Sequence, residues 1–522
     1  MICGNVRLCT IAHCVDTYRF ANSYWSLERN ASQILLKALN NEIRQTLRNH
    51  DRRFTKALDS AADYSIYMNK TLYQNAANSH ADLRFILPYS PEALMPPFST
   101  PKIILHRCIL SARVPYVAFQ LVRRWPTSRD VPVKNRRVSP IPLRALIYWA
   151  YTGQLPRDFL SSFQEDLYFL AKQWRVVELT RMLRSNTMNP KYRTTTQAST
   201  KILQDELLVL VWCLNNDELV EGWLEKEVPH LETFEAFSSG LSEIKESIKA
   251  DSSEGETLTE LQYFAGLLMI RASCPDIIVQ IGDVQFPCHK CFLIRSDYFQ
   301  AFIDGSFTEA HRVRDVQNVP SESLPVLSIT LTQDPNLFKC VLEYLYTDNC
   351  SRFNSDSEFM MELLSVADLL LLEQLKTACV NHIVGLSYDL IMNPAELLRV
   401  SWATNLPRLE QFATRYYATH FDEVVTTKEF KNLVKDSAQS VKNREDQDTI
   451  IFVDDLTWWL CRLHGFDQST ENDIGITGKK GEYLVRVGEN LENRTLECER
   501  KIGLLADVVT ELGLDIFVPE EY

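Results

Sequence analysis

A short stretch occurs twice in this chain, as LHRCIL at residues 105–110 and as CHKCFL at residues 288–293. Two further segments recur in the same order. LIYWAYTG at 146–153 matches VLEYLYTD at 341–348, and FLAK at 169–172 matches SVAD at 365–368. Three matching blocks at similar spacing indicate two copies of one domain of about 100 residues, which is an ordinary domain size. We call them the first repeat (residues 81–187) and the second repeat (residues 271–385).

The second repeat has readable local signals. Residues 276–281 and 284–286 are rich in β-branched and apolar residues and flank Gly282-Asp283, which predicts a β-hairpin. Residues 291–302 favour a helix, and the alternation at 327–331 favours a half-buried strand. Asp334-Pro335 is typical of a helix start, and Ser355 with Glu358 has the spacing of a capping box. These signals predict an α+β fold.

The first repeat has the same kinds of helix-start signal. Ser139-Pro140 precedes one apolar helical stretch, and Ser162 with Glu165 precedes another. A proline-rich insert at 88–101 separates the predicted strands at 82–85 and 102–105.

Composition limits the function classes. The 522 residues carry a formal net charge of −13, which argues against a general nucleic-acid binder. The 13 cysteines are scattered and odd in number, so a reducing compartment is expected rather than a disulfide framework. No apolar run is long enough to cross a bilayer, and Arg7 and Asp16 interrupt the start of the chain. We expect a cytoplasmic protein, with the nucleus as an additional location.

The order of these motifs resembles the BTB/POZ fold. A strand hairpin is followed by His-Lys/Arg, a tyrosine-containing helix, Tyr-Thr and an Ala-containing helix. The tandem arrangement resembles the ankyrin-repeat and BTB/POZ domain-containing protein 1 family over roughly residues 30–522. The resemblance assigns fold or pairing roles to Asp82, His106, Tyr116, Asp276, His289, Lys290, Tyr298 and Phe299.

The predicted architecture is two tandem BTB/POZ domains with an acidic helical connector and a C-terminal α-helical, BACK-like extension. Residues 1–80 show no ankyrin signature, which leaves a short isoform or an incomplete gene model as alternatives. The expected domains are an N-terminal helical segment with ankyrin repeats absent or truncated (1–80), the first BTB/POZ domain (81–187), the connector (188–270), the second BTB/POZ domain (271–385), BACK-like helices (386–437) and a C-terminal helical region (438–522).

The middle of the connector is strongly acidic. Residues 214–260 hold 13 acidic residues against three lysines. An acidic docking face for a basic partner is one interpretation, and a solvated, partly helical spacer is the favoured one.

No constellation indicates catalysis. Cys288-His289-Lys290-Cys291 has metal-ligand residue types but no second pair to complete a zinc site. Asp454-Asp455 fits a helix N-terminus as well as a metal site, and residues 475–481 lack the ending of a P-loop. The basic stretch at 123–137 favours a solvated loop over a nuclear-import or phosphate-binding patch. We predict a non-enzymatic protein with no cofactor and no metal.

The resemblance also implies a partner. In cullin-binding BTB domains a hydrophobic-x-Glu tripeptide contacts the cullin, and Phe307-Thr308-Glu309 occupies the matching position. An apolar anchor beside a carboxylate suits an interface hot spot. Phe307, Glu309 and Tyr346 are the predicted cullin-3-binding residues. Residues 120–131 of the first repeat hold no equivalent tripeptide.

BTB domains usually pair, and here the two copies can pair within the chain or across two chains. The internal pair is favoured because it closes without a second chain, and it predicts one cullin-3 per chain. The expected function is an adaptor, a substrate receptor for a cullin-3 RING ubiquitin ligase. The alternative is a BTB-mediated scaffold or signalling regulator without ligase function. The family resemblance implies translation elongation factor 1A as a protein substrate, and no residue identifies one.

Overall fold

A computed structural model describes residues 64–87, 102–133, 140–156, 163–188, 196–224, 233–249, 258–304, 324–330, 332–350, 356–386, 393–441, 450–464 and 491–514. The chain divides into two compact units. We call residues 47–353 and 366–377 the repeat unit. Residues 1–46, 354–365 and 378–522 form the C-terminal unit.

Each repeat builds one small sheet with the same topology. In the first, β1 (Leu83–Ile86) lies between β2 (Lys102–Leu105) and β3 (Asp130–Pro132), antiparallel to β2 and parallel to β3. In the second, β4 (Ile277–Ile281) lies in the same way between β5 (Val284–Cys288) and β6 (Val326–Ile329). The predicted hairpin at Gly282 is confirmed, since β4 and β5 pair with Ile281 opposite Val284.

Within the described residues, each sheet is accompanied by a matching series of five helices along the chain. The first repeat has α5 (Arg107–Arg113), α6 (Pro115–Arg123), α7 (Pro140–Thr152), α8 (Gln164–Gln173) and α9 (Val177–Met188). The second has α14 (Lys290–Leu293), α15 (Asp297–Asp304), α17 (Pro335–Thr347), α18 (Ser357–Leu369) and α19 (Glu373–Gly385). Small sheets with many helices agree with the α+β expectation.

Helix boundaries in the second repeat agree in part with the sequence. Asp334 caps α17 as predicted, accepting a hydrogen bond from the Asn336 N–H at 2.8 Å, with Pro335 in the first turn. The helix expected over 291–302 is instead broken by a turn at 294–296 between α14 and α15. Ser355 lies outside the described residues, and Asp356 accepts the Glu358 N–H at 2.9 Å.

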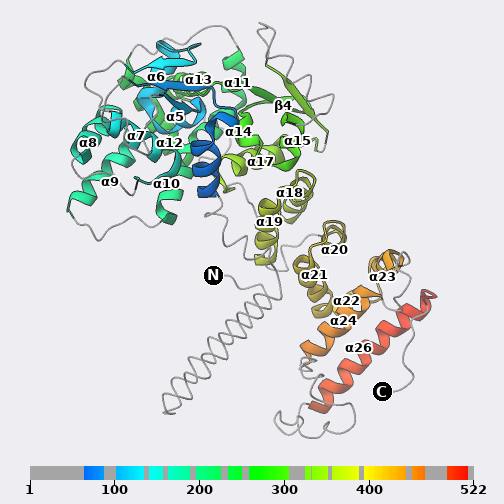
Figure 1. Cartoon of the computed structure of the whole chain (residues 1–522). Helices are drawn as coiled ribbons and strands as arrows, with labels where there is room; N and C mark the ends of the chain where they lie inside the picture. The colour runs from blue at the N-terminus through cyan, green and yellow to red at the C-terminus, as the bar shows by residue number, and fades with distance from the viewer. Residues whose placement is uncertain are drawn as a thin grey trace, which may run out of the picture. The chain divides into compact units, whose positions relative to one another are not determined.

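The segment between the repeats contributes core helices, and its acidic stretch 214–260, expected to be a solvated, partly helical spacer, forms helices with a buried face where the structure describes it. Helix α10 (Thr196–Leu214) buries Leu203, Leu207 and Leu210 and packs against α5, α7 and α17. Helix α13 (Glu260–Ser273) packs against α5 and α6 (Figure 1). The reason is amphipathicity, because a helix can carry many acidic residues on its outer face and still bury an apolar one.

The acidic part of this segment shows that pattern. It forms α11 (Asp217–Leu224) and α12 (Phe234–Lys249), and α12 buries Phe237 and Ile244. Gly240 lets α12 approach α13 closely, since a Cβ there would lie 2.6 Å from the Ala265 Cβ.

A short helical segment precedes the first sheet. It contains the π-helix η1 (Tyr67–Gln74) and the 3-10 helix η2 (Ala76–Asn78). Of the helical segment predicted over residues 1–80, only the part from residue 64 is described.

The described part of the C-terminal unit is helical. Its helices are α20 (Pro394–Ala403), α21 (Pro407–Thr419), α22 (Phe421–Val424), α23 (Lys428–Val441), α24 (Ile451–Leu463) and α26 (Leu491–Glu511). Tyr417, Phe430 and Phe452 pack with ring centroids 5.7–6.0 Å apart and anchor its core. Among the described residues, no helix is long and apolar enough to cross a membrane.

Candidate functional site

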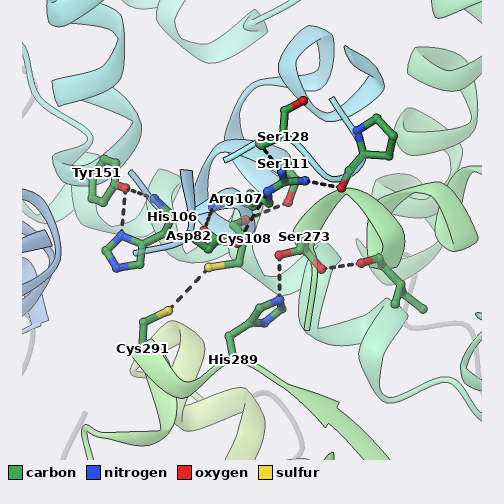
Figure 2. A network of polar contacts seen from close by, with 12 residues as sticks. Asp82, His106, Arg107, Cys108, Ser111, Ser128, Tyr151, Ser273, His289 and Cys291 are labelled. Atoms are coloured by element: carbon green, nitrogen blue, oxygen red, sulfur yellow. Dashed lines mark hydrogen bonds and ion pairs between the residues drawn. The ribbon is translucent and has the colours of Figure 1, made fainter. Parts of the chain in front are cut away.

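The second repeat holds a buried histidine in a closed polar network (Figure 2). The Nδ1 of His289 lies 2.8 Å from the Tyr346 hydroxyl, which also accepts the His289 backbone N–H at 2.9 Å. The Nε2 lies 3.1 Å from the Ser273 carbonyl, to which it donates. Burial lowers the pKa of His289 to about 3, so the ring is neutral at physiological pH.

The first repeat holds the same network. His106 contacts the Tyr151 hydroxyl through Nδ1 at 3.0 Å and through its backbone N–H at 2.8 Å. Its Nε2 lies 2.8 Å from the Ser79 carbonyl. Burial lowers the pKa of His106 to about 4. In both repeats, therefore, a histidine ties the segment before the sheet to the tyrosine near the end of α7 or α17.

A partly buried carboxyl group lies at the N-terminus of the helix that follows the histidine in each repeat. Asp82 accepts the Arg107 N–H at 2.9 Å, and Asp276 accepts the Lys290 N–H at 2.8 Å. Burial raises the pKa of Asp82 to about 6 and of Asp276 to about 7, although these hydrogen bonds lower it. Both groups satisfy helix N-terminal donors that would otherwise be unpaired.

A buried arginine in each repeat was missed by the sequence analysis. Arg113 donates to the Trp149 carbonyl at 3.2 Å and to the Ala150 carbonyl at 3.1 Å. Arg295 donates to the matching Tyr344 carbonyl at 3.0 Å. Arg113 follows its histidine by seven residues and Arg295 by six. Only an alignment that allows this one-residue offset would have found the pair.

The two arginines differ in their acidic partners. Arg113 pairs with Glu206 of α10 at 2.5 Å, whereas Arg295 pairs with Asp348 of its own repeat at 2.6 Å. Burial lowers the pKa of Arg113, and Glu206 only partly offsets this effect. Burial also lowers the pKa of Arg295, but Asp348 and the neighbouring tyrosines raise it above its usual range.

The two repeats contact each other through equivalent residues. The Sγ atoms of Cys108 and Cys291, which occupy the same place in the two copies of the motif, are 3.6 Å apart (Figure 2). A residue that meets its own counterpart marks the axis of a two-fold interface. The motif that defines the repeat therefore also lies at the contact between the repeats.

The segments that precede the two sheets cross over to the opposite repeat. Tyr64 donates to the Tyr346 carbonyl, and Tyr67 donates to the Cys291 carbonyl. In return α13, which precedes the second sheet, packs on α5 and α6 of the first repeat. Near the surface, the His80 Nε2 lies 3.4 Å from the Asp304 carboxylate of α15. Each repeat therefore contacts the segment that precedes the sheet of the other repeat.

The aromatic residues with predicted pairing roles lie in apolar clusters. Tyr116 stacks on Trp174 with centroids 5.4 Å apart, and Phe234 of α12 meets its edge at 5.5 Å. Phe299 is buried, and Tyr298 is half-buried beside Phe302. These contacts give Tyr116, Tyr298 and Phe299 a packing role.

The structure describes only one of the three predicted cullin-binding residues. Phe307 and Glu309 lie outside the described residues. Tyr346 has no exposed side chain and its hydroxyl is held by His289, so a surface contact through Tyr346 is wrong. The physical reason is that its hydroxyl satisfies buried donors and acceptors that would otherwise be unpaired.

The turn between α18 and α19 exposes two large apolar side chains. Leu369 is 51% exposed and Leu371 is 54% exposed. The Ser296 hydroxyl donates to the Leu370 carbonyl at 2.6 Å and fixes this turn to the second repeat. The matching turn of the first repeat exposes Gln173 and Arg175 at these positions, next to the exposed Lys172. Arg175 and Leu371 both adopt a left-handed φ, near 57°, so the two turns have equivalent backbones.

The remaining sequence motifs were considered as candidates for metal or phosphate binding. Within the described ranges, no group of three or more His, Cys, Asp or Glu side chains is arranged to hold a metal ion. Asp454 lies in the first turn of α24, as a helix N-terminus favours. Residues 475–481 and the end of the basic stretch, 134–137, lie outside the described part of the chain.

The comparisons identify the type of the second repeat. Residues 268–386 match the family model of the BTB/POZ domain. The chain is 23% identical to BTB/POZ domain-containing protein 3 of Schizosaccharomyces pombe over 483 residues, which cover 92% of this chain and 76% of that protein.

Other relatives match shorter regions. The chain is 30% identical to ankyrin repeat-containing protein YIL001W of Saccharomyces cerevisiae over 211 residues, 38% of this chain and 40% of that protein. It is 24% identical to Kelch-like protein 40b of Danio rerio over 204 residues, 38% of this chain and 29% of that protein. These matches support a BTB/POZ relationship but do not single out the ankyrin-repeat and BTB/POZ domain-containing protein 1 family.

Proposed function

We propose that this chain is a protein-interaction adaptor in which both repeats are BTB/POZ domains, paired with each other inside one chain. The family model matches the second repeat. The first repeat has the same sheet order and the same buried histidine, aspartate and arginine contacts. The contact between Cys108 and Cys291 carries the pairing proposal, because equivalent residues meet only around a two-fold axis.

Internal pairing decides which surfaces are free for partners. Tyr64, Met68 and Leu72 of the segment at 64–80 are buried, and helix α13 packs on α5 and α6, so part of the pairing face is already occupied. The chain then needs no second copy to complete its fold, and its other surfaces serve partner proteins.

The second repeat would dock on cullin-3 and so bring a bound protein to a ubiquitin ligase. Leu369 and Leu371 support this proposal, since adjacent exposed apolar side chains on a fixed turn are typical of a docking surface. Phe307 and Glu309 remain part of it through the family resemblance. The first repeat has cations at the equivalent turn, so we expect one cullin-3 per chain.

The test is a pull-down of the purified N-terminal domain of cullin-3. Leu369→Asp should weaken binding by about tenfold or more, because it places a charge at an apolar contact. Phe307→Ala with Glu309→Ala should do the same. Phe169→Asp is the matched control, since Phe169 is 57% exposed in the first repeat. Thermal melting checks that each variant is folded.

Two results would count against the ligase proposal. If the native chain fails to bind cullin-3, the scaffold function without a ligase takes its place. Equal loss of binding in Leu369→Asp and Phe169→Asp would show that the α18–α19 turn is not the contact.

A further inference from the structure

We infer that the groove along α8 and α9 of the first repeat binds an acidic peptide segment of a partner protein. The groove has a volume of about 650 Å³ and is lined by Lys172, Arg175, Val177, Thr180, Arg181 and Arg184. This inference goes beyond cullin-3 docking and does not depend on it.

The groove has a surplus of positive charge in a chain whose formal net charge is −13. All four of its cationic residues are exposed. The adjoining carboxylate, Glu178, already has two partners, Arg181 at 2.7 Å and Lys245 at 3.9 Å. The acidic residues in the first turn of α8 lie toward the Arg184 end of the groove, where Gln164 contacts the Leu183 carbonyl and Arg184 donates to the Tyr168 hydroxyl at 3.2 Å. The positive charge offered to an anionic ligand is therefore concentrated at Lys172 and Arg175, at the other end.

The backbone beneath the groove is well fixed. The Trp174 N–H donates to the Leu170 carbonyl at 2.9 Å, and the Val176 N–H donates to the Ala171 carbonyl at 2.8 Å. The Trp174 ring is buried against Tyr116. Arg175 and the residues after it are thus presented from a rigid turn, which reduces the entropy lost when a ligand binds.

The chemistry of the lining favours a peptide over a nucleic acid. Guanidinium groups bind carboxylates through paired hydrogen bonds, and three of them line the groove. Arg181 also pairs with Glu178, and Arg184 donates to the Tyr168 hydroxyl. Val177 is 59% exposed and adds an apolar contact. None of the six lining residues is aromatic, whereas single-stranded nucleic acids are usually held by stacking on aromatic rings.

The second repeat lacks this groove chemistry. Its matching α18–α19 turn has Asp368, Leu371 and Glu373, and Lys376 pairs with both carboxylates. The acidic-peptide site is therefore specific to the first repeat.

The experiment measures fluorescence anisotropy of a labelled twelve-residue peptide in which glutamate alternates with serine. A peptide with glutamine in place of glutamate is the ligand control. The native chain should bind the glutamate peptide at least about tenfold more tightly, and added salt should weaken that binding. Arg175→Gln with Arg181→Gln should lower the affinity by about tenfold or more, because two charge-assisted contacts are lost.

Lys428→Gln with Lys435→Gln removes the same charge from exposed positions of α23 and is the matched control. It should change the affinity by less than about twofold, since unpaired surface charges act weakly in salt. Equal weakening by both double variants would mean general charge attraction and would overturn the inference.

Three further outcomes would also overturn the inference: equal binding of the two peptides, absence of binding, or stronger binding of a single-stranded DNA of equal charge. The cullin-3 pull-down should be unchanged in Arg175→Gln with Arg181→Gln, so failure here is distinguishable from failure of the ligase proposal.

Discussion

The first repeat presents Lys172 and Arg175 at a turn where the second presents Leu369 and Leu371, yet each repeat buries the same histidine–tyrosine contact. The side chains that hold the fold are duplicated, and those that face solvent have different chemistry. Packing constrains a buried residue from every side, whereas an exposed one is constrained mainly by what it binds. Two similar domains can therefore serve two partners.

The repeats also differ in what stabilises their buried arginines. Arg295 is paired within its own repeat, with Asp348 only 1% exposed. Arg113 relies on Glu206 of α10, which is 13% exposed. The buried arginine of the first repeat thus has its acidic partner in the segment between the repeats, whereas Arg295 has one within its own repeat.

The largest expected effect tests that difference. Arg295→Met should lower the free energy of unfolding of the repeat unit by about 3–5 kcal/mol, because it removes the cation that pairs with the buried Asp348 carboxylate. Arg113→Met should cost less, since the Glu206 side chain is 13% exposed and that of Asp348 only 1%. Urea unfolding followed by tryptophan fluorescence measures both. Equal losses would contradict the proposed dependence on α10.

The buried histidines predict a pH dependence. His289→Gln should cost about 2–3 kcal/mol at pH 7, because the Tyr346 and Ser273 contacts are lost. The folded-state pKa of His289 is lowered to about 3, so its stabilising effect is complete above the unfolded pKa of about 6.5 and is lost as pH falls toward 3. The cost of the substitution should therefore shrink by about 1.4 kcal/mol per pH unit below 6.5.

The aspartates act in the opposite direction. The folded-state pKa of Asp276 is raised to about 7, so the stability it contributes is present at low pH and is lost as pH rises through 7. For this reason the test compares His289→Gln with the native chain at each pH, by urea unfolding at pH 7 and pH 5. A cost that is the same at both pH values would rule out a buried neutral histidine.

The close approach of α12 and α13 predicts a smaller effect. Gly240→Ala should destabilise the repeat unit by about 1–3 kcal/mol, since its Cβ would clash with Ala265 and the Leu261 carbonyl. Gly503→Ala in α26 is the matched control, because no atom lies within 4 Å of its Cβ. It should stabilise its helix by up to about 1 kcal/mol. Differential scanning calorimetry distinguishes the two, and a stabilising Gly240→Ala would show looser packing.

Exchanging the surface residues should change stability least. Arg175→Leu and Leu371→Arg each place the residue of one turn at the equivalent exposed position of the other. Both should alter the free energy of unfolding by less than about 0.5 kcal/mol. Leu371→Arg should nevertheless weaken cullin-3 binding, and Arg175→Leu should not. If the two variants bound cullin-3 equally well, the proposed functional difference between the two turns would be wrong.

The sequence predicted what depends on local signals. The β4–β5 hairpin followed from Gly282-Asp283, and the start of α17 followed from Asp334-Pro335. The repeat motif itself showed that two similar domains exist. These features are readable because turn and cap geometry are set by a few adjacent residues.

Long-range features were not predictable in the same way. The acidic composition of 214–260 hid the buried side of α12, since charge averaged over a segment does not show which residues face inward. Tyr346 was assigned to a surface because a family pattern marks the position without its environment. The role of Glu206 depends on Arg113, 93 residues earlier in the chain, so only the folded structure brings them together.

Internal pairing of the repeats is most directly tested by a disulfide cross-link. Isotope labelling then shows whether the two joined cysteines come from one chain or from two. His80→Cys and Asp304→Cys place two thiols at a partly exposed contact between the repeats. Equal amounts of natural-abundance and nitrogen-15-labelled chain are mixed unfolded, refolded together and oxidised with oxidised glutathione. Mass spectrometry then reads the peptides joined between residues 80 and 304. Internal pairing predicts that each joined pair carries a single isotope, and pairs that combine both isotopes would contradict it.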